Sequence, residues 1–383
     1  MTTGLILSGG GARAAYQVGV LRAAIEIHGR DELPFDVICG TSAGAINAAF
    51  VAANAHRPRE GLEALYRTWR GISPADVYDP RWRAVIGSLA RIAFAPLRRG
   101  ERAAPRSLLN SEPLRGMLRN WLDFDAVRKN LASGALQSLC ITAMDYATGT
   151  SVAFYEGGGL PSWDRIYRRG EPARLGHEHV MASAAIPILF PAQRIGDAFY
   201  GDGALRQLHP ISPALKLGAS RLFVIGVSTR RLDSPEMIDR RRPSIGQMAG
   251  HMLNREFIDN LEADILLAER INALTDELGA DGAGRAGMQH IETLVITPSQ
   301  PFNAIAAAYM KDQPRSMRLL FRLLGAGPQG AGASFASYLM FDGNFCARLM
   351  DLGYADTMRE RDRVAAFLDG SSRPVFSSAP SAH

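Results

Sequence analysis

Residues 37–50 read VICGTSAGAINAAF, and this stretch determines the fold that we expect the chain to adopt. The apolar run at its start predicts a buried strand, and the alanine-rich run at its end predicts a helix packed closely on a sheet. The Gly-x-Ser-x-Gly sequence between them places Ser42 at a sharp turn from strand to helix. Gly40 and Gly44 leave space where a side chain would clash, so the turn presents the Ser42 hydroxyl outward. Ser42 is therefore the candidate nucleophile, on an elbow formed by the two glycines.

A second glycine-rich turn lies near the N-terminus. Residues 8–13 read SGGGAR, after an apolar strand expected at residues 5–7 and before an amphipathic helix. Backbone N–H groups at the start of a helix point toward negative charge. Gly9, Gly10 and Gly11 therefore predict an oxyanion hole.

The same turn has a competing interpretation, because residues 9–14 also match a relaxed dinucleotide-binding pattern. That kind of site places an acidic residue at the end of the second strand, about 20 residues further on. Here the second strand ends in Cys39-Gly40-Thr41-Ser42, and Asp36 lies before the strand. The context favours an oxyanion hole over a nucleotide site.

Two further motifs lie far downstream, where residues 181–191 read MASAAIPILFP and residues 200–204 read YGDGA. Together with the two glycine-rich turns, and with LLNSEPLR at 108–115, they resemble the patatin-like phospholipase family in order and spacing. The resemblance covers residues 4–228, with one departure at Ala14, where many members have glycine. Two later segments resemble bacterial members less distinctively: residues 337–342 and 352–356.

The resemblance implies a catalytic dyad of Ser42 and Asp202, in which no histidine takes part. Ser42 would attack an ester carbonyl and form an acyl-serine intermediate, while Asp202 accepts the proton and returns it to the leaving alcohol. Gly203 and Ala204 complete the turn that carries Asp202. The usual pKa of an aspartate, about 3.9, makes a poor base for a hydroxyl, so the site must be dry.

For the first glycine-rich turn, the resemblance implies that the N–H groups of Gly10 and Gly11 bind the oxyanion of the tetrahedral intermediate. Arg13 has two possible roles there. It adds positive potential, or it fixes the loop through structural contacts.

Other residues are also candidates for the partner of Ser42. A Ser-acid-His order is typical of α/β-hydrolases, and three histidines follow Asp202: His209, His251 and His290. None of them lies in a recognisable loop signature. Three more aspartates are possible partners: Asp145, Asp164 and Asp197. Asp202 alone lies between two glycines, in a turn that can present a carboxylate to a cleft.

The remaining pattern predicts an α/β three-layer sandwich, with a mostly parallel central sheet and helices on both faces. Further buried strands are expected at residues 139–144, 222–227 and 293–297, and a long helix is expected at 250–278. We expect a catalytic domain at 1–228 with a cap or insertion near 70–120, a mainly helical extension at 229–369 packed on the same core, a flexible loop at 325–332, and a disordered tail at 370–383.

Composition indicates a cytoplasmic enzyme without a resident cofactor or metal. The 383 residues are 47% hydrophobic, enough for a large core, and no signal-peptide pattern precedes the first strand. Cys39, Cys140 and Cys346 lie in apolar surroundings without metal-ligand spacing, which is typical of reduced core residues. The net charge is only +5, and no nucleic-acid-binding motif is present, so nucleic acid is not an expected partner.

Residues 80–106 have an unusual charge pattern, with seven arginines and one acid interleaved with apolar residues at helical spacing. A basic amphipathic helix of this kind can lie on an anionic membrane, here the inner face of the cell membrane. It can equally form a cap helix whose apolar face covers the active site. Both interpretations remain open.

The sequence therefore predicts a serine lipolytic acyl hydrolase of phospholipase or lysophospholipase type. The family resemblance implies phospholipid or lysophospholipid as the first expected substrate, and neutral glycerides, thioesters and small esters are alternatives. A patatin-like scaffold that binds lipid without turnover is the non-catalytic alternative, and a dinucleotide-binding protein is the less favoured one. The oligomeric state is left open.

Overall fold

The computed structural model describes residues 1–79, 107–229, 260–323, 325–326 and 331–371, and five isolated positions between 244 and 253. The helix expected at 80–106 lies outside the described residues, as do His251, residues 254–259 of the expected long helix, residues 327–330 of the expected loop and residues 372–383 of the expected tail.

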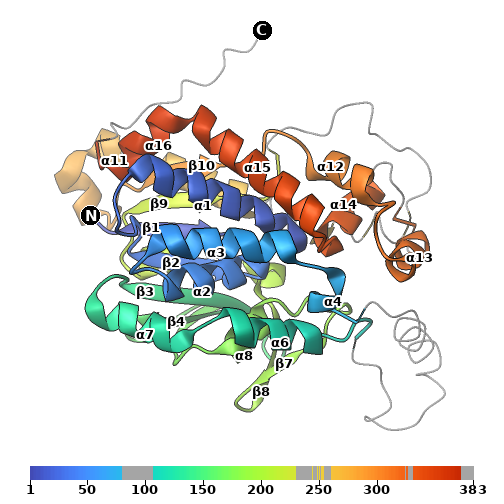
Figure 1. Ribbon diagram of the computed structural model, residues 1–383. Helices are drawn as coiled ribbons and strands as arrows, with labels where there is room; N and C mark the ends of the chain where they lie inside the picture. The colour runs from blue at the N-terminus through green and yellow to red at the C-terminus, as the bar shows by residue number, and fades with distance from the viewer. Residues whose placement is uncertain are drawn as a thin grey trace.

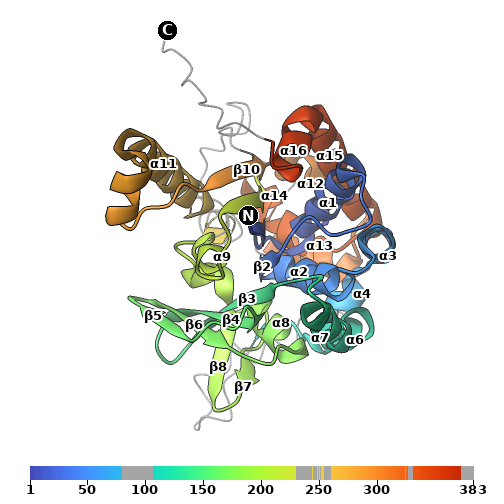
Figure 2. The same ribbon diagram turned by 90° about the vertical axis from the view of Figure 1, so that its left-hand side faces the viewer.

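A ten-stranded sheet forms the centre of the molecule, in the order β10-β9-β1-β2-β3-β4-β6-β5, with β8 also paired to β3 and β7 paired to β8 (Figure 2). The strands are β1 (Thr3–Leu7), β2 (Val37–Thr41), β3 (Ser138–Asp145), β4 (Thr150–Gly157), β5 (Trp163–Arg165), β6 (Arg168–Pro172), β7 (Gln193–Ile195), β8 (Ala198–Asp202), β9 (Arg221–Ile225) and β10 (Glu292–Ile296). From β10 to β3 every pairing is parallel. All five strands of this parallel part were expected from apolar runs in the sequence.

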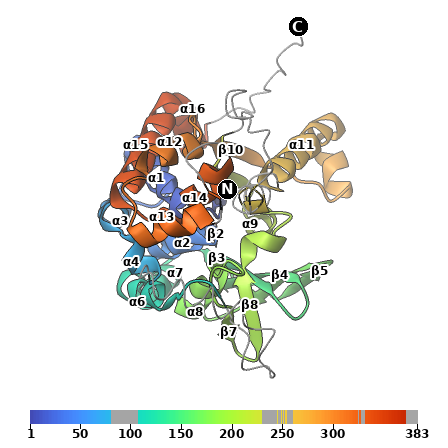
Figure 3. The ribbon, with the colours of Figure 1, turned by 90° about the vertical axis from the view of Figure 1, so that its right-hand side faces the viewer.

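Helices cover both faces of the sheet (Figures 1, 2 and 3). The α-helices are α1 (Ala15–His28), α2 (Ala43–Ala53), α3 (Pro58–Gly71), α4 (Pro74–Val77), α6 (Glu112–Trp121), α7 (Phe124–Ser133), α8 (His177–Ser183), α9 (Ser212–Lys216), α11 (Asn260–Arg285), α12 (Phe302–Tyr309), α13 (Arg315–Leu323), α14 (Ala331–Leu339), α15 (Gly343–Arg359) and α16 (Arg361–Leu368). Short 3₁₀ turns occupy Gly11–Ala14 and Gly203–Arg206. The predicted α/β sandwich with a mostly parallel sheet is confirmed.

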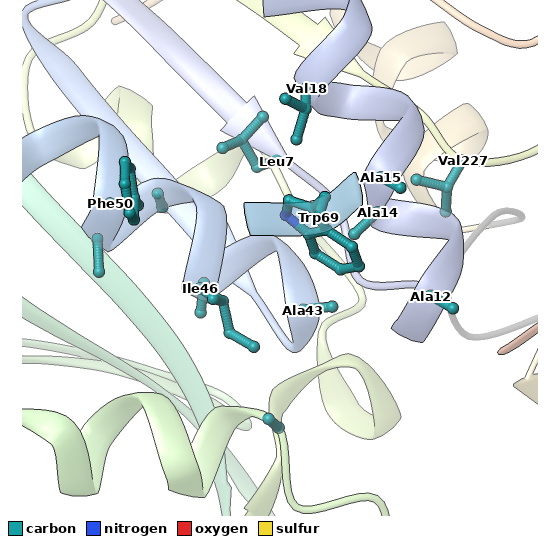
Figure 4. Close-up of a cluster of buried hydrophobic side chains, with 14 of the residues drawn as sticks. Leu7, Ala12, Ala14, Ala15, Val18, Ala43, Ile46, Phe50, Trp69 and Val227 are labelled. Carbon is teal, nitrogen blue, oxygen red and sulfur yellow. The ribbon is translucent and has the colours of Figure 1, made fainter. Parts of the chain in front are cut away.

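The main hydrophobic core lies between the sheet and the layer that contains α1, α2 and α3 (Figure 4). Alanines dominate the buried residues of α2, so this helix approaches the sheet closely. The contact between α1 and α15 is equally close, because a side chain at Gly19 would lie 1.8 Å from the Met350 carbonyl oxygen. A second core lies on the opposite face, under α9 and α11.

Several features of the structure differ from the sequence prediction or were not expected. Five strands from β4 to β8 were not predicted, and most of their pairings are antiparallel. The strand β10 is only partly buried, because it forms an edge of the sheet. The long helix α11 is present from Asn260 onward and is interrupted at Gly279, where φ is +64°.

The predicted domain boundary near residue 228 is crossed by hydrogen bonds, since β9 pairs with β10. Both sides of that boundary therefore contribute to one sheet. Within the described part of the chain, no helix combines the length and the apolar character needed to cross a membrane.

Candidate active site

The Gly-x-Ser-x-Gly turn forms a strained elbow between β2 and α2. Ser42 has φ +56° and ψ −130°, a backbone conformation that residues other than glycine rarely adopt. A Cβ at Gly44 would lie 2.3 Å from the Leu7 carbonyl oxygen, and one at Gly40 would lie 2.6 Å from the carbonyl oxygen of Gly44. The backbone thus passes through spaces that only glycine fits, and the Ser42 side chain is directed into a pocket that it helps to line.

Ser42 and Asp202, which are 160 positions apart in sequence, are in direct contact. The Ser42 Oγ donates a hydrogen bond of 2.5 Å to Asp202 Oδ2. The other carboxylate oxygen, Oδ1, accepts from the N–H of Ala204 at 3.0 Å. The strand β8 holds Asp202 opposite Ala143 of β3, so the carboxylate is fixed by the central sheet.

Asp202 is fully buried, with 0% of its surface exposed. Burial raises the pKa of this carboxyl from 3.8 to about 7, although the hydrogen bonds from Ser42 and Ala204 act in the opposite direction. A carboxylate with this pKa is a much better proton acceptor at neutral pH than an exposed aspartate. The structure thus provides the dry environment that the sequence analysis required.

Ser183, at the end of α8, fixes the position of the elbow. The N–H of Ser42 donates to Ser183 Oγ at 2.8 Å, and the Ser183 hydroxyl donates to the Thr142 carbonyl oxygen at 2.6 Å. The Ser42 amide is therefore already engaged and is not offered to a substrate. Ser183 lies within the motif at residues 181–191, but its contact with Ser42 was not predicted.

The first glycine-rich turn reaches the same pocket through Gly11, which lines it together with Ser42. Gly11 has φ +55°, and a Cβ there would lie 2.2 Å from the Tyr338 carbonyl oxygen. A Cβ at Gly10 would lie 2.7 Å from a methyl group of Val227. Gly9 instead lines a separate small cavity.

Arg13 is buried and contacts α14, far along the chain. Its Nε donates to Ser337 Oγ at 2.7 Å, and its Nη2 donates to Ser334 Oγ at 2.8 Å. Its guanidinium also lies 3.8 Å from the centre of the Tyr338 ring. These contacts favour the loop-fixing role over a purely electrostatic one.

A buried hydrogen-bond chain connects the wall of the pocket to the glycine-rich turn. Trp69 Nε1 donates to Asn47 Oδ1 at 2.9 Å, and Asn47 Nδ2 donates to Gln17 Oε1 at 2.9 Å. Gln17 Nε2 then donates to the Ser8 carbonyl oxygen at 2.7 Å. In this series of hydrogen bonds, each side chain donates to the next one, and the last bond is accepted by the backbone. The series therefore fixes the backbone at residue 8 relative to α2 and α3.

The pocket above Ser42 is lined almost entirely by apolar side chains. Its described lining residues are Gly11, Ser42, Ala43, Ile46, Trp69, Ile72, Val77, Leu114, Met117, Trp121, Ala184, Ile186, Phe190, Tyr338, Leu339 and Phe341. Such a lining suits a hydrocarbon chain next to Ser42.

The alternative partners considered for Ser42 lie elsewhere or are engaged. His209 pairs with Asp264 at 2.9 Å. His290 precedes β10, so it lies at the N-terminal ends of the parallel strands, whereas Ser42 follows β2 at their C-terminal ends. Asp145 accepts hydrogen bonds in the turn that follows β3. The other two aspartates lie on the surface: Asp164 and Asp197.

Among the described residues, no group of three or more His, Cys, Asp and Glu side chains could hold a metal ion. The three cysteines are buried and free of disulfide bonds.

Comparisons with known proteins identify the family to which the chain belongs. The chain is 48% identical over 54 residues to lysophospholipase nte1 of Aspergillus terreus, a stretch that is 14% of this chain and only 3% of the fungal protein. The crystal structure of VipD from Legionella pneumophila is similar over 94% of this chain and 67% of that chain, at 13% identity and a TM-score of 0.34. Residues 5–215, more than half of the chain, match the patatin-like phospholipase family. The chain therefore belongs to the patatin-like phospholipase family of hydrolases.

Proposed function

We propose that the chain hydrolyses carboxylic esters of acyl lipids through a Ser42–Asp202 dyad. The observation that carries the proposal is the 2.5 Å hydrogen bond from Ser42 Oγ to a fully buried Asp202, at a pocket of apolar side chains. A nucleophile in contact with its base is the arrangement that covalent acyl transfer requires.

In the first half of the reaction, Ser42 Oγ attacks the ester carbonyl carbon while its proton moves to Asp202 Oδ2. The negative charge that develops on the carbonyl oxygen is stabilised by the N–H groups of Gly10 and Gly11. When the tetrahedral intermediate collapses, the C–O bond to the alcohol breaks and Asp202 returns the proton to the leaving oxygen. An acyl-Ser42 ester remains.

In the second half, a water molecule attacks the acyl-Ser42 carbonyl and gives its proton to Asp202. Collapse of this intermediate releases the free acid, and the proton returns to Ser42 Oγ. Both halves use the same carboxylate. The raised pKa of Asp202 allows it to accept and to release a proton near neutral pH.

Phospholipid or lysophospholipid is the substrate class that we propose first. The support comes from the family and from the fungal relative, which is named a lysophospholipase. The apolar lining next to Ser42 supports a substrate whose acyl part is a hydrocarbon chain.

The first experiment compares wild type, Ser42→Ala and Asp202→Asn on p-nitrophenyl butanoate and on a panel of phosphatidylcholine, lysophosphatidylcholine and triacylglycerol. We expect each substitution to lower kcat/KM by on the order of 10³ or more. Fluorophosphonate should label wild type at Ser42 and should not label Ser42→Ala. The matched control is Asp197→Asn, which changes the same functional group on the surface, where its partner is Arg194.

Each outcome decides between the candidates. Full activity of Asp202→Asn would refute the dyad. Loss of activity on replacing His209, His251 or His290 by alanine would then favour a triad. A folded wild-type protein that neither hydrolyses any ester nor reacts with fluorophosphonate would favour the lipid-binding scaffold. Thermal unfolding of every variant separates loss of catalysis from loss of structure.

A further inference from the structure

The pocket above Ser42 is too small for a lipid acyl chain. Its cavity is about 30 Å³, close to the volume that one water molecule occupies in the liquid. Ligand sites for larger molecules commonly enclose some 300–1,000 Å³. A long acyl chain bound at Ser42 must therefore continue into space beyond this pocket.

A larger space lies directly behind one wall of the pocket above Ser42. A groove of about 510 Å³ runs between the end of α3, α4 and α6, and Figures 1 and 3 show α4 beside α6. Three residues line both the groove and the catalytic pocket: Ile72, Met117 and Trp121. These side chains form a partition one residue thick, and Met117 is a flexible side chain that adopts several shapes at low cost.

The groove has apolar faces on the side of the catalytic pocket and polar residues elsewhere. The partition contributes three apolar faces, and Ala75 and Pro113 add two more. Gly71 and Gly116 also line it, and a Cβ at either position would meet no atom within 4 Å. The remaining described lining residues are polar: Arg67, Thr68, Asp76 and Asn120.

We propose that this groove is an acyl-chain subsite that continues the catalytic pocket, and that it makes the enzyme selective for long acyl chains. The carbonyl end of the chain lies at Ser42, and the chain passes between Met117 and Trp121 into the groove. The proposal rests on the proposed ester hydrolysis and adds the acyl-chain class of the substrate.

Gly116 offers a test outside the catalytic machinery. A Cβ at Gly116 meets no atom within 4 Å, so Gly116→Phe can direct its ring into the groove, and a helix tolerates phenylalanine better than glycine. We expect Gly116→Phe to lower the ratio of kcat/KM for p-nitrophenyl dodecanoate to that for p-nitrophenyl butanoate by tenfold or more, because each buried methylene contributes about fourfold. Hydrolysis of the butanoate should change little.

Two controls accompany this variant. Gly116→Ala adds only a methyl group at the same position, and Gly284→Phe adds the same ring at an exposed helical glycine that also has open space. Neither should change the ratio. As an independent check, Met117→Ala thins the partition and should raise the ratio several-fold in a protein that remains folded.

The outcomes separate this inference from the proposed function. If Gly116→Phe leaves the ratio unchanged, or lowers both activities equally, the groove is not an acyl subsite, while ester hydrolysis by Ser42 stands. If the wild type hydrolyses neither ester, the proposed function and this inference both fail.

Discussion

The nucleophile elbow at residues 40–44 and the glycine-rich turn at residues 8–13 are held in different ways. At Gly44 of the elbow, the atoms that exclude a side chain belong to the backbone, and the Leu7 carbonyl oxygen is the nearest of them. Gly40 faces both the Ala48 side chain and the Gly44 carbonyl oxygen. The glycine-rich turn depends on distant parts of the chain, because Gly10 faces the Val227 side chain and Gly11 faces the Tyr338 carbonyl.

This difference shows which parts of the chain the candidate site needs. The family match ends at residue 215, yet Arg13 is held by Ser334 and Ser337 of α14. Tyr338 contributes both to the support of the turn and to the lining of the pocket. The C-terminal region is therefore part of the candidate active site, and its contribution is concentrated at the glycine-rich turn.

The largest effect is expected at the elbow. Gly44→Ala places a methyl group 2.3 Å from the Leu7 carbonyl oxygen and 2.6 Å from that of Ser8. Neither backbone atom can move without disturbing β1, so we expect kcat/KM for p-nitrophenyl butanoate to fall by on the order of 10³ or more. Steady-state kinetics together with thermal unfolding would measure it. Near-normal activity of Gly44→Ala would show that the elbow is less rigid than the structure indicates.

The second prediction concerns pH, and it also separates the two regions. If deprotonated Asp202 is the base, as we propose, its pKa of about 7 means that kcat/KM should fall about tenfold per pH unit below pH 7. At pH 5 the loss is therefore about 100-fold. Variants of the glycine-rich turn should lower the whole profile without moving its midpoint, because the titrating group belongs to the elbow side. A midpoint near pH 4 in wild type would contradict the prediction.

The same shift has a consequence for stability. The pKa of Asp202 is raised on folding, so its contribution to the free energy of unfolding is fully present below about pH 4 and is lost as the pH rises through about 7. Asp202→Asn removes this dependence. Urea unfolding at pH 5 and pH 8 should show Asp202→Asn gaining stability relative to wild type at the higher pH, and no relative gain would contradict the assignment.

The elbow and the parallel strands could be predicted because their determinants are adjacent in the sequence. Gly40, Ser42 and Gly44 lie between an apolar run and an alanine-rich run, so local steric rules are enough. The strand β6 could not be predicted, because Arg168–Pro172 has no apolar alternation and becomes a strand by pairing with β4. Its conformation comes from tertiary contacts.

The supporting residues of the site were also missed, for a related reason. Ser183 and Asn47 are ordinary polar residues in sequence, and their roles depend on which distant backbone groups they meet. Only the Ala-Ser-x-x-x-Pro segment around Ser183 gave a signal that could have drawn attention to it. The pairing of Ser42 with Asp202 was expected through family resemblance, and the fold brings the two side chains into contact.

The fourth prediction tests whether a side chain limits the space at Gly10 of the glycine-rich turn. Gly10→Ala places a methyl group 2.7 Å from a Val227 methyl, so the turn must shift and kcat should fall by about 10- to 100-fold. Val227→Ala removes the obstructing methyl group, and the double variant Gly10→Ala/Val227→Ala should recover most of the loss. Gly44 of the elbow has no such rescue, because the three atoms nearest to a Cβ placed there are all backbone atoms. Failure of the double variant to recover activity would remove this distinction between the two regions.

The smallest effect is expected at Arg13, where Arg13→Lys keeps the charge and loses the forked contacts to Ser334 and Ser337. If Arg13 acts by fixing the turn, kcat should fall by roughly three- to tenfold with KM unchanged, because oxyanion stabilisation is needed only in the transition state. The matched control is Arg22→Lys, since Arg22 also stacks on a tyrosine ring, at 4.1 Å, but at a distance from the pocket. Wild-type kcat in Arg13→Lys would assign Arg13 the electrostatic role, for which charge alone is sufficient. A similar loss in both variants would instead point to a general effect of replacing a stacked arginine.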